Sequence, residues 1–316
     1  MFGFLEVCVV FLLLFITRIY FSDCDAVLHF YERFAKKPDK RLRGKIIWIT
    51  GASSGIGEHL AYKLAQFGCK LVLSARRKDE LERVKTQCLN LASKIFPLTF
   101  DEDFLVVPLD VTDFTSHNNC AATVFQHFGK IDFLVNNAGI LQLGLASECD
   151  LDVDLSVLNI NVLGTISLTK AVLPHMVRSK SGQIVVLSSA SGKCAAAGSR
   201  CAAYAASKHA LQGYFNTLRM EVHNENVGVT MVCPGLIHSN ILKNALRENL
   251  QTRRDQDFPP STIKTERAVH LLIIAMVNEL KEVWIAVPKR LVDLYLAQYL
   301  PVVGNWWLHR KNRKGS

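Results

Sequence analysis

A glycine-rich segment between an apolar run and an amphipathic one constrains this chain more than any other feature of its sequence. Residues 46–49 read Ile-Ile-Trp-Ile, and they lead directly into Thr50-Gly51-Ala52-Ser53-Ser54-Gly55-Ile56-Gly57. Such glycines let the backbone approach a pyrophosphate, and the helix that begins there offers free N–H groups with partial positive charge. The segment predicts a dinucleotide-binding turn; a plain tight turn is the alternative.

Short apolar runs alternate with amphipathic stretches after residue 45. The predicted strands are residues 46–49, 70–74, 104–109, 131–135, 183–187, 228–232 and 283–287; the predicted helices are residues 56–67, 79–91, 117–128, 154–179, 203–223 and 268–280. This alternation favours a parallel sheet covered by helices on both faces. We therefore expect one α/β domain, a doubly wound parallel sheet, over residues 45–290.

The residues after the second predicted strand indicate which dinucleotide binds. A site for NAD places a carboxylate there, about 20 residues after the glycines, to bind the ribose 2′-hydroxyl. This chain instead has Arg76 and Arg77, and the nearest acid is Asp79. Guanidinium groups suit a 2′-phosphate through charge-assisted hydrogen bonds. The sequence predicts NADP(H); the alternative is an arginine pair in a solvated loop.

The two ends of the chain predict a membrane location. Residues 1–22 are largely apolar and read as an uncleaved transmembrane anchor near the lower length limit for a span. A basic linker is expected over residues 23–44, and the positive-inside tendency places the following domain in the cytosol. Residues 291–316 form an apolar, aromatic and basic C-terminal segment, expected either in the membrane interface or packed on the domain or on a partner subunit.

Charge and cysteine content exclude other classes of protein. The net charge of +9 is concentrated near the two ends, which suits an anionic membrane surface better than nucleic acid, because no basic stripe with interleaved aromatics is present. The nine cysteines are scattered without a C-x-x-C pair, so neither a disulfide framework nor a metal site is predicted.

From Thr50 onward the chain resembles the short-chain dehydrogenase/reductase (SDR) family. The motifs that carry the resemblance occur in the family's order: residues 50–57, Asp110-Val111, Asn136-Asn137-Ala138-Gly139, Asn161, Ser188-Ser189, Tyr204-Ala205-Ala206-Ser207-Lys208 and Pro234-Gly235. Residues 73–85, 172–176 and 281–285 further resemble the dehydrogenase/reductase member-seven group, which is microsomal. The resemblance implies a Rossmann-type fold and an NADP(H)-dependent oxidoreductase.

The residues also predict the chemistry. Reduction of a carbonyl by hydride needs a proton donor, and a tyrosine pKa near ~10 must be lowered before the phenolate can act as a base in the reverse reaction. Tyr204 and Lys208 lie four residues apart and share one helix face, so the ammonium can stabilise the phenolate. The resemblance adds that Lys208 holds the nicotinamide ribose and that Asn161 joins a proton relay through water.

The catalytic serine has two candidates. A hydroxyl beside the tyrosine would stabilise charge on the substrate oxygen. The pattern Ser188-Ser189-Ala190-Ser191-Gly192 assigns this role to Ser189, but Ser189 lies fifteen residues before Tyr204, about two more than is usual in the family. Residues 194–201 would then carry a loop insertion. Ser191 restores the spacing and stays the alternative.

The resemblance implies the rest of the cofactor site and the nature of the substrate. The cofactor-binding residues are Gly51, Ser53, Ser54, Gly55, Ile56, Gly57, Arg76, Arg77, Asp110, Val111, Asn136, Ala138, Gly139, Tyr204, Lys208, Pro234, Gly235, Ile237 and Ser239. Residues 241–262 correspond to a mobile substrate lid. A membrane location favours a lipophilic carbonyl or secondary alcohol, such as a steroid, a retinoid or a xenobiotic ketone, and the family permits a homodimer.

Two further interpretations remain from the sequence alone. Residues 313–316 resemble a dibasic endoplasmic-reticulum retrieval signal, and a solvated basic tail is the alternative. The chain could also be a non-catalytic membrane scaffold that binds NADP(H), although relatives that lose catalysis usually lose the tyrosine or the lysine, and both are present.

Overall fold

The computed structural model describes residues 22–34, 38–194, 200–252, 259 and 262–312. Its helices are α2 (Ala26–Phe34), α3 (Asp39–Leu42), α4 (Gly55–Ala65), α5 (Lys78–Ser93), α6 (His117–Phe128), α7 (Leu151–Leu158), α8 (Gly164–Ser179), α9 (Ala202–Glu221), α10 (Thr265–Val277), α11 (Pro288–Tyr299) and α12 (Pro301–Asn312). The strands are β1 (Ile46–Thr50), β2 (Lys70–Ser74), β3 (Phe104–Val106), β4 (Phe133–Asn136), β5 (Gln183–Leu187), β6 (Gly228–Pro234) and β7 (Glu282–Ile285).

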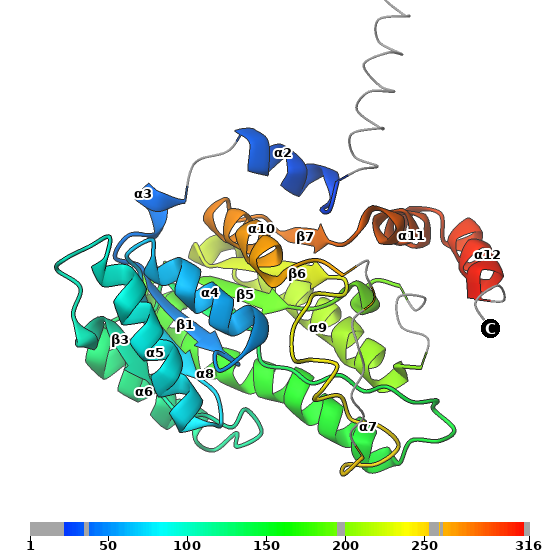
Figure 1. Cartoon of the computed structure of the whole chain (residues 1–316), viewed down its shortest axis with the longest axis horizontal. Coiled ribbons are helices and arrows are strands. Elements are labelled where there is room, and N and C mark those ends of the chain that lie inside the picture. The colour runs from blue at the N-terminus through cyan, green and yellow to red at the C-terminus, as the bar shows by residue number, and fades with distance from the viewer. Residues whose placement is uncertain (1–21, 35–37, 195–199, 253–258, 260–261, 313–316) are drawn as a thin grey trace, which may run out of the picture.

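The strands form one parallel sheet in the order β3-β2-β1-β4-β5-β6-β7. This confirms the predicted doubly wound sheet. The order reverses between β1 and β4, so the connections that leave these two strands diverge to opposite faces of the sheet (Figure 1). Ligands of open α/β sheets bind in the crevice that such a reversal creates at the carboxyl ends of the strands.

Side chains of each strand enter two separate core layers. In β1, Ile47 and Ile49 pack into the layer under α4, α5 and α10, whereas Trp48 packs into the layer under α6, α8 and α9. Leu71 and Val72 of β2 divide in the same way. Because strand side chains alternate between faces, a continuous apolar run fills both layers at once.

One helical run among the described residues, Leu151–Ser179, has the length and apolar composition of a membrane span. Its Leu168 and Val172 are fully buried in the layer shared with α6 and α9. Packing within the domain therefore accounts for the apolar character of this run. The predicted anchor over residues 1–22 lies outside the described residues except for Ser22.

The segment expected to be a basic linker folds onto the domain instead. Helix α2 packs against α10 and β7, with Leu28 fully buried. The Arg267 guanidinium of α10 donates to both carboxylate oxygens of Asp23 at 2.7 Å and also binds Glu32. The paired residues are far apart in the chain. The composition of a short helix does not predict which distant residues it will contact.

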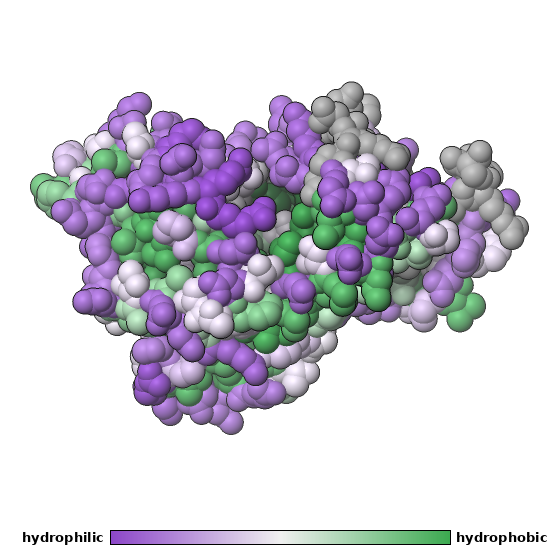
Figure 2. Space-filling model, turned by 90° about the horizontal axis from the view of Figure 1, so that it is seen from below, coloured by the Kyte–Doolittle hydropathy of each residue, from purple (hydrophilic) through white to green (hydrophobic). Residues whose placement is uncertain are grey.

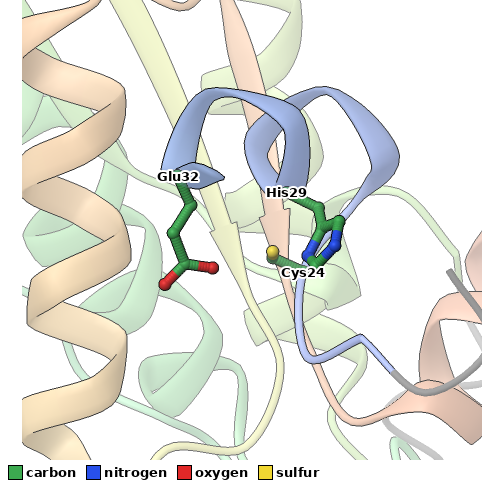
Figure 3. A group of neighbouring side chains, drawn as sticks. All are labelled: Cys24, His29 and Glu32. Carbon is green, nitrogen blue, oxygen red and sulfur yellow. The ribbon is translucent and has the colours of Figure 1, made fainter. Parts of the chain in front are cut away.

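Three side chains of this region, Cys24, His29 and Glu32, lie close enough to share a metal ion (Figure 3). Glu32, however, is paired with Arg267, and burial raises the pKa of the Cys24 thiol to about 12. A metal needs a thiolate and a free carboxylate at such a site. The charges present suit a structural contact between α2 and α10 better than a metal centre.

We predict that Arg267→Leu lowers the free energy of unfolding of the full chain by about 1–3 kcal/mol, because Asp23 and Glu32 lose the cation that they share. This cation lowers the pKa of both carboxyl groups, so its contribution is present near neutral pH and is lost as the pH falls through those pKa values. Urea unfolding measures the change.

The matched control is Arg83→Leu, which removes a guanidinium from an exposed pair with Glu58 and Glu80. Exposed pairs contribute less than about 1 kcal/mol. Equal losses in both variants would show that the contact between α2 and α10 is no stronger than a surface ion pair.

Candidate active site

A cleft of about 470 Å³ lies at the carboxyl ends of β1, β2, β4, β5 and β6. The space-filling view of the lower side of Figure 1 shows hydrophobic side chains around a hollow near the middle of the molecule (Figure 2). The predicted site residues that line the cleft are Gly51, Ser53, Ser54, Gly55, Ile56, Arg76, Arg77, Asp110, Val111, Ala138, Gly139, Tyr204, Lys208, Pro234 and Ser239. Residues from distant parts of the sequence thus converge on one cavity.

The glycine-rich turn has the backbone that its sequence predicts. Gly51 and Gly55 adopt φ values of +65° and +59°, a region that glycine enters without steric cost. A Cβ on Gly57 would lie 2.4 Å from the Gly51 carbonyl oxygen, so no side chain fits there. Gly57 is not among the residues that line the cleft. Its role is to permit the close packing that shapes the turn.

Hydrogen bonds from the end of β4 hold this turn in place. The Thr50 hydroxyl accepts from the backbone N–H groups of Asn137 and Ala138, both at 3.0 Å, and the Asn137 side-chain amide donates to the Thr50 carbonyl at 2.8 Å. The preceding Asn136 is buried and donates to Thr169 at 2.9 Å instead. Within the predicted motif, Asn137 rather than Asn136 therefore contacts the turn and lines the cleft.

The amino terminus of α4 faces the cleft. Ser54 occupies the N-cap position with extended backbone angles, and within the described part of the chain its hydroxyl makes no capping hydrogen bond. The first N–H groups of a helix and its dipole attract anions. The turn and the helix terminus together fit a pyrophosphate.

Arg76 and Arg77 follow β2 at the far end of the cleft, and both are exposed. The Arg77 guanidinium donates to the Ser53 hydroxyl at 3.4 Å, which brings it over the glycine-rich turn. The Asp110 carboxylate accepts from the backbone N–H and the hydroxyl of Thr112 at 2.9 and 2.7 Å. Asp110 thus stabilises its own loop, while the two cations face the cavity.

Tyr204 and Lys208 lie on one face of α9, as their spacing predicts, with the ammonium nitrogen 5.6 Å from the centre of the phenol ring. Lys208 Nζ donates to the Leu187 carbonyl at the end of β5, at 2.8 Å. Burial raises the pKa of Tyr204 to about 12 and lowers the pKa of Lys208 to about 8. Both shifts have the same physical cause, which is the cost of holding a charge away from water.

Ser189, and not Ser191, interacts with the tyrosine. A side-chain hydrogen bond between Ser189 and Tyr204 opposes the rise in the phenol pKa. The Ser189 hydroxyl also accepts from the Ser191 backbone N–H at 3.1 Å and donates to the Pro234 carbonyl at 3.4 Å. The Ser191 side chain is hydrogen-bonded to Cys201. The geometry favours Ser189; most of the proposed insertion, residues 195–199, lies outside the described residues.

Asn161 lies in a π-helical turn, residues 159–163, between α7 and α8. Its side-chain oxygen accepts from the Ile140 N–H at 2.8 Å, and its amide donates to the Ile140 carbonyl at 2.9 Å and to Ser207 at 3.0 Å. Insertions of this kind often occur at functional sites. Here the insertion turns a buried amide toward the loop that follows β4 and connects this loop to α9.

The remaining predicted residues lie behind the cleft or over it. Gly235 packs against Ala286, and Ile237 is buried in the core, so neither lines the cavity. Ser239 covers Gly55, with its Cβ 3.1 Å from the position that a Gly55 Cβ would take. Cleft-lining residues that the sequence analysis did not assign to the cofactor site include Asn240, which precedes the predicted lid, and Ile241 and Asn244, which lie in it; none carries a recognisable motif.

Apolar side chains pack around the tyrosine. Leu141, Cys201, Leu242 and Ala245 are buried against it, and Leu143 and Ile241 pack at the edge of this cluster. The segment around Leu246 closes over it, because Leu143 N–H donates to the Leu246 carbonyl at 2.9 Å and Leu246 N–H donates to the Leu141 carbonyl at 2.8 Å. Part of the predicted lid is therefore bound to the loop after β4.

The fold and the arrangement of this cleft are those of a dehydrogenase family. The family model for short chain dehydrogenases matches residues 45–250, more than half of the chain. The chain therefore belongs to the short-chain dehydrogenase family. It is an oxidoreductase with a nicotinamide cofactor and a small-molecule substrate that is reduced or oxidised at a CH–OH carbon.

Individual relatives narrow the position within the family. Dehydrogenase/reductase SDR family member 7 of Homo sapiens is 44% identical over 316 residues, which cover 98% of this chain and 90% of that protein. Among solved structures, a Burkholderia phymatum short chain dehydrogenase/reductase in complex with NAD aligns with a TM-score of 0.70 and 23% identity, covering 81% of this chain and 93% of that one. An actinorhodin polyketide ketoreductase variant with NADPH aligns with a TM-score of 0.57 and 28% identity, covering 62% and 72%. The 44% identity to family member 7 confirms the resemblance to the member-seven group.

We predict that Ser189→Ala lowers kcat by about 10²–10³-fold, the usual cost of removing a donor to a developing oxyanion. Ser191→Ala should retain kcat within about a factor of three, because Ser191 faces Cys201 rather than Tyr204. Steady-state kinetics of both variants make the comparison. A larger loss for Ser191→Ala would reverse the assignment.

Proposed function

We propose that this protein is a membrane-bound, NADP(H)-dependent oxidoreductase that interconverts the carbonyl and the secondary alcohol of a lipophilic small molecule. The observation that carries the proposal is that Tyr204 and Lys208 of α9 line the same cleft as the glycine-rich turn, with Ser189 hydrogen-bonded to Tyr204. The acid/base group and the phosphate-binding turn face one cavity, as hydride transfer requires.

The cofactor preference rests on charge at the end of β2. Arg76 and Arg77 line the cleft where the adenosine ribose binds in dinucleotide folds, and Asp110, the carboxylate on the next strand connection, accepts hydrogen bonds from Thr112. Two cations without a competing acid favour the 2′-phosphate of NADP(H). Gly51, Ser53, Ser54 and Gly55 would hold the pyrophosphate, and Val111 would contact adenine.

The bound cofactor supplies the hydride, and the protein moves the proton. With its pKa raised by burial, Tyr204 stays protonated at neutral pH and can donate to the oxygen of a carbonyl that is being reduced. Ser189 donates a hydrogen bond to the same oxygen. Lys208, held by the Leu187 carbonyl, provides the positive charge that stabilises a phenolate and can reach the nicotinamide ribose.

Asn161 acts in this scheme as a positioning residue. Its amide fixes the loop at Ile140 and meets Ser207, whose hydroxyl donates to the Tyr204 carbonyl at 2.7 Å. A Cβ on Gly139 would lie 3.2 Å from the Asn161 side-chain oxygen and 3.6 Å from Lys208 Nζ. A proton relay from Lys208 through water near Asn161 is consistent with this proximity.

The substrate class and the location follow from surface chemistry and from the two chain ends. The apolar side chains packed around Tyr204, of which Ile241 also lines the cleft, favour a lipophilic carbonyl such as a steroid, a retinoid or a xenobiotic ketone. We propose that residues 1–22 anchor the protein in the endoplasmic-reticulum membrane as a single span, with the domain over residues 45–290 in the cytosol. A homodimer is compatible with this arrangement.

Full-length protein in membranes should oxidise NADPH in the presence of apolar ketones and should use NADH far less well. The decrease in nicotinamide absorbance follows the reaction across a panel of steroidal, retinoid and xenobiotic carbonyls. Tight binding of NADPH with no turnover of any panel member would favour a non-catalytic scaffold over an enzyme.

We predict that Arg76→Ala raises the Kd for NADPH by about 10–100-fold, the usual effect of losing a charge-assisted hydrogen bond, and leaves the Kd for NADH nearly unchanged. Fluorescence titration of the nicotinamide measures both constants. Arg83→Ala is the control, because that arginine pairs with Glu58 and Glu80 and does not line the cleft. An equal rise in the Kd values for NADPH and NADH in Arg76→Ala would contradict the assignment of Arg76 to the 2′-phosphate.

The pH dependence of kcat/KM for NADPH should follow the ionisation of Lys208. Its pKa is lowered by burial to about 8, so the ammonium is present below this pH and is lost above it. Because kcat/KM for NADPH reflects the free enzyme, this constant should fall by up to about tenfold per pH unit above pH 8. A flat profile up to pH 10 would show that the charge of Lys208 is not required.

A further inference from the structure

Apolar side chains are exposed on the first described helix of the chain. Val27, Phe30 and Phe34 of α2 are 54%, 58% and 71% exposed. Spacings of three and four residues place them on one side of the helix. The opposite side carries Leu28 and Tyr31, which pack into the core beside α10. The exposed side is therefore a second apolar face that the domain does not use.

The last described helix has the same character. Val302 and Trp306 of α12 are 82% and 58% exposed, and exposed neighbours add to them: Tyr299 at the end of α11, Leu300 between the two helices and Val303 of α12. Its inner side carries Gly304, where a Cβ would lie 2.7 Å from Ala297 of α11, and Leu308, which is buried. Helix α12 thus packs tightly on α11 with one face and exposes the other.

Polar contacts of a buried carboxylate fix the orientation of α12 on α11. The Asp293 carboxylate of α11 is nearly inaccessible and accepts from Lys311 Nζ at 2.8 and 3.0 Å and from the Trp307 indole N–H at 3.1 Å. Removing one partner from such a buried ion pair is costly. The hairpin of α11 and α12 therefore holds Trp306 outward.

Helix α2 contacts the C-terminal part of the chain, to which α12 belongs. The Ala26 N–H of α2 donates to the Tyr295 hydroxyl of α11 at 3.1 Å, and Cys24 forms a β-bridge with Ile285, just before α11. Figure 1 shows α2, β7, α11 and α12 along its upper and right-hand edge. We call the exposed residues Val27, Phe30, Phe34, Val302, Val303 and Trp306 the apolar edge.

The surroundings of the apolar edge indicate which partner it suits. The Arg310 guanidinium lies 5.4 Å from the centre of the Trp306 ring, and His309 and Lys311 are its neighbours on α12. At the other end, Arg33 follows Phe30, and Lys40 is exposed on α3. Aromatic side chains beside cations are typical of surfaces that lie at an anionic membrane interface. Soluble monomers rarely expose large apolar patches to water, so the apolar edge calls for a partner.

The position of the chain entry favours the same partner. The described chain begins at Ser22, beside Cys24 and α2, and the 21 preceding residues are largely apolar. A bilayer that holds those residues lies directly next to α2. We propose that the apolar edge docks into the headgroup region of an anionic lipid bilayer, as a contact of the folded domain that is separate from the anchor.

This inference rests on the membrane part of the proposed function and adds a second attachment. A single span leaves a domain free to rotate about one flexible connection, whereas two contacts at α2 and α12 restrict its orientation. The docked state combines apolar burial with attraction of the basic residues to anionic headgroups. Docking should therefore weaken when phosphatidylserine is replaced by a neutral lipid.

The tryptophans of the chain provide a direct probe. The four tryptophans are Trp48, Trp284, Trp306 and Trp307, so none lies in the predicted anchor. Full-length protein would be reconstituted in nanodiscs of phosphatidylcholine and phosphatidylserine, with acyl chains brominated near the headgroup, and the emission compared with unbrominated discs. Trp306→Phe should remove most of the bromine-dependent quenching, and Trp284→Phe, at a position that is 6% exposed, should leave it unchanged.

Two charged variants test the other contacts. Phe34→Glu and Val302→Glu change exposed residues, so circular dichroism should match wild type while quenching falls. Absence of bromine-dependent quenching in the wild type would overturn the proposal. Cross-linking between apolar edges of two copies, with Trp306 protected from the bromolipid, would assign the surface to a dimer instead. NADPH turnover is measured on the same discs. Turnover without quenching would contradict the docking proposal alone, whereas absence of turnover would contradict the proposed oxidoreductase activity.

Discussion

The hydrogen bonds between Thr50 and the residues after β4 are the contact on which the rest of the site depends. They bind the end of β1 to the end of β4 at the point where the strand order reverses. The glycine-rich turn, the loop at Gly139 and the amino terminus of α4 all take their positions from this junction. Since β5 and β6 follow β4 in the sheet, the same junction also sets where Tyr204 lies relative to the glycine-rich turn across the cleft.

The burial of Tyr204 and Lys208 also sets the protonation of these two residues. The same exclusion of water keeps Tyr204 protonated and weakens the hold of Lys208 on its proton. Ser189 offsets part of the effect on the tyrosine, and the Leu187 carbonyl holds the ammonium in place. A site built this way is competent for proton donation at neutral pH and depends on added positive charge for the reverse reaction.

Local patterns predicted the sheet and most of the cleft, because strands 46–49 and 70–74, the glycine turn and the Tyr204–Lys208 pair each follow from short-range rules. Long-range contacts were harder to predict. Residues 23–44 were expected to be a basic linker, yet Arg267 of α10 binds Asp23 within them, and no local pattern signals a pairing over 244 positions. Asn136 was expected to bind the cofactor, but its side chain is buried against Thr169 and Asn137 lines the cleft, since strand residues alternate in direction and a motif does not specify where a strand ends. The choice between Ser189 and Ser191 also required the fold, because chain spacing and motif disagreed.

We propose that Tyr204 transfers the proton in a cleft that binds NADP(H) independently of this residue. The most direct test compares wild type with Tyr204→Phe in single-turnover reduction of a ketone by bound NADPH, with the Kd for NADPH measured on the same samples. We predict a rate lower by about 10²–10⁴-fold at an unchanged Kd, because the ring remains and only the proton donor is lost. An unchanged rate would show that the proton comes from another group and would contradict the account.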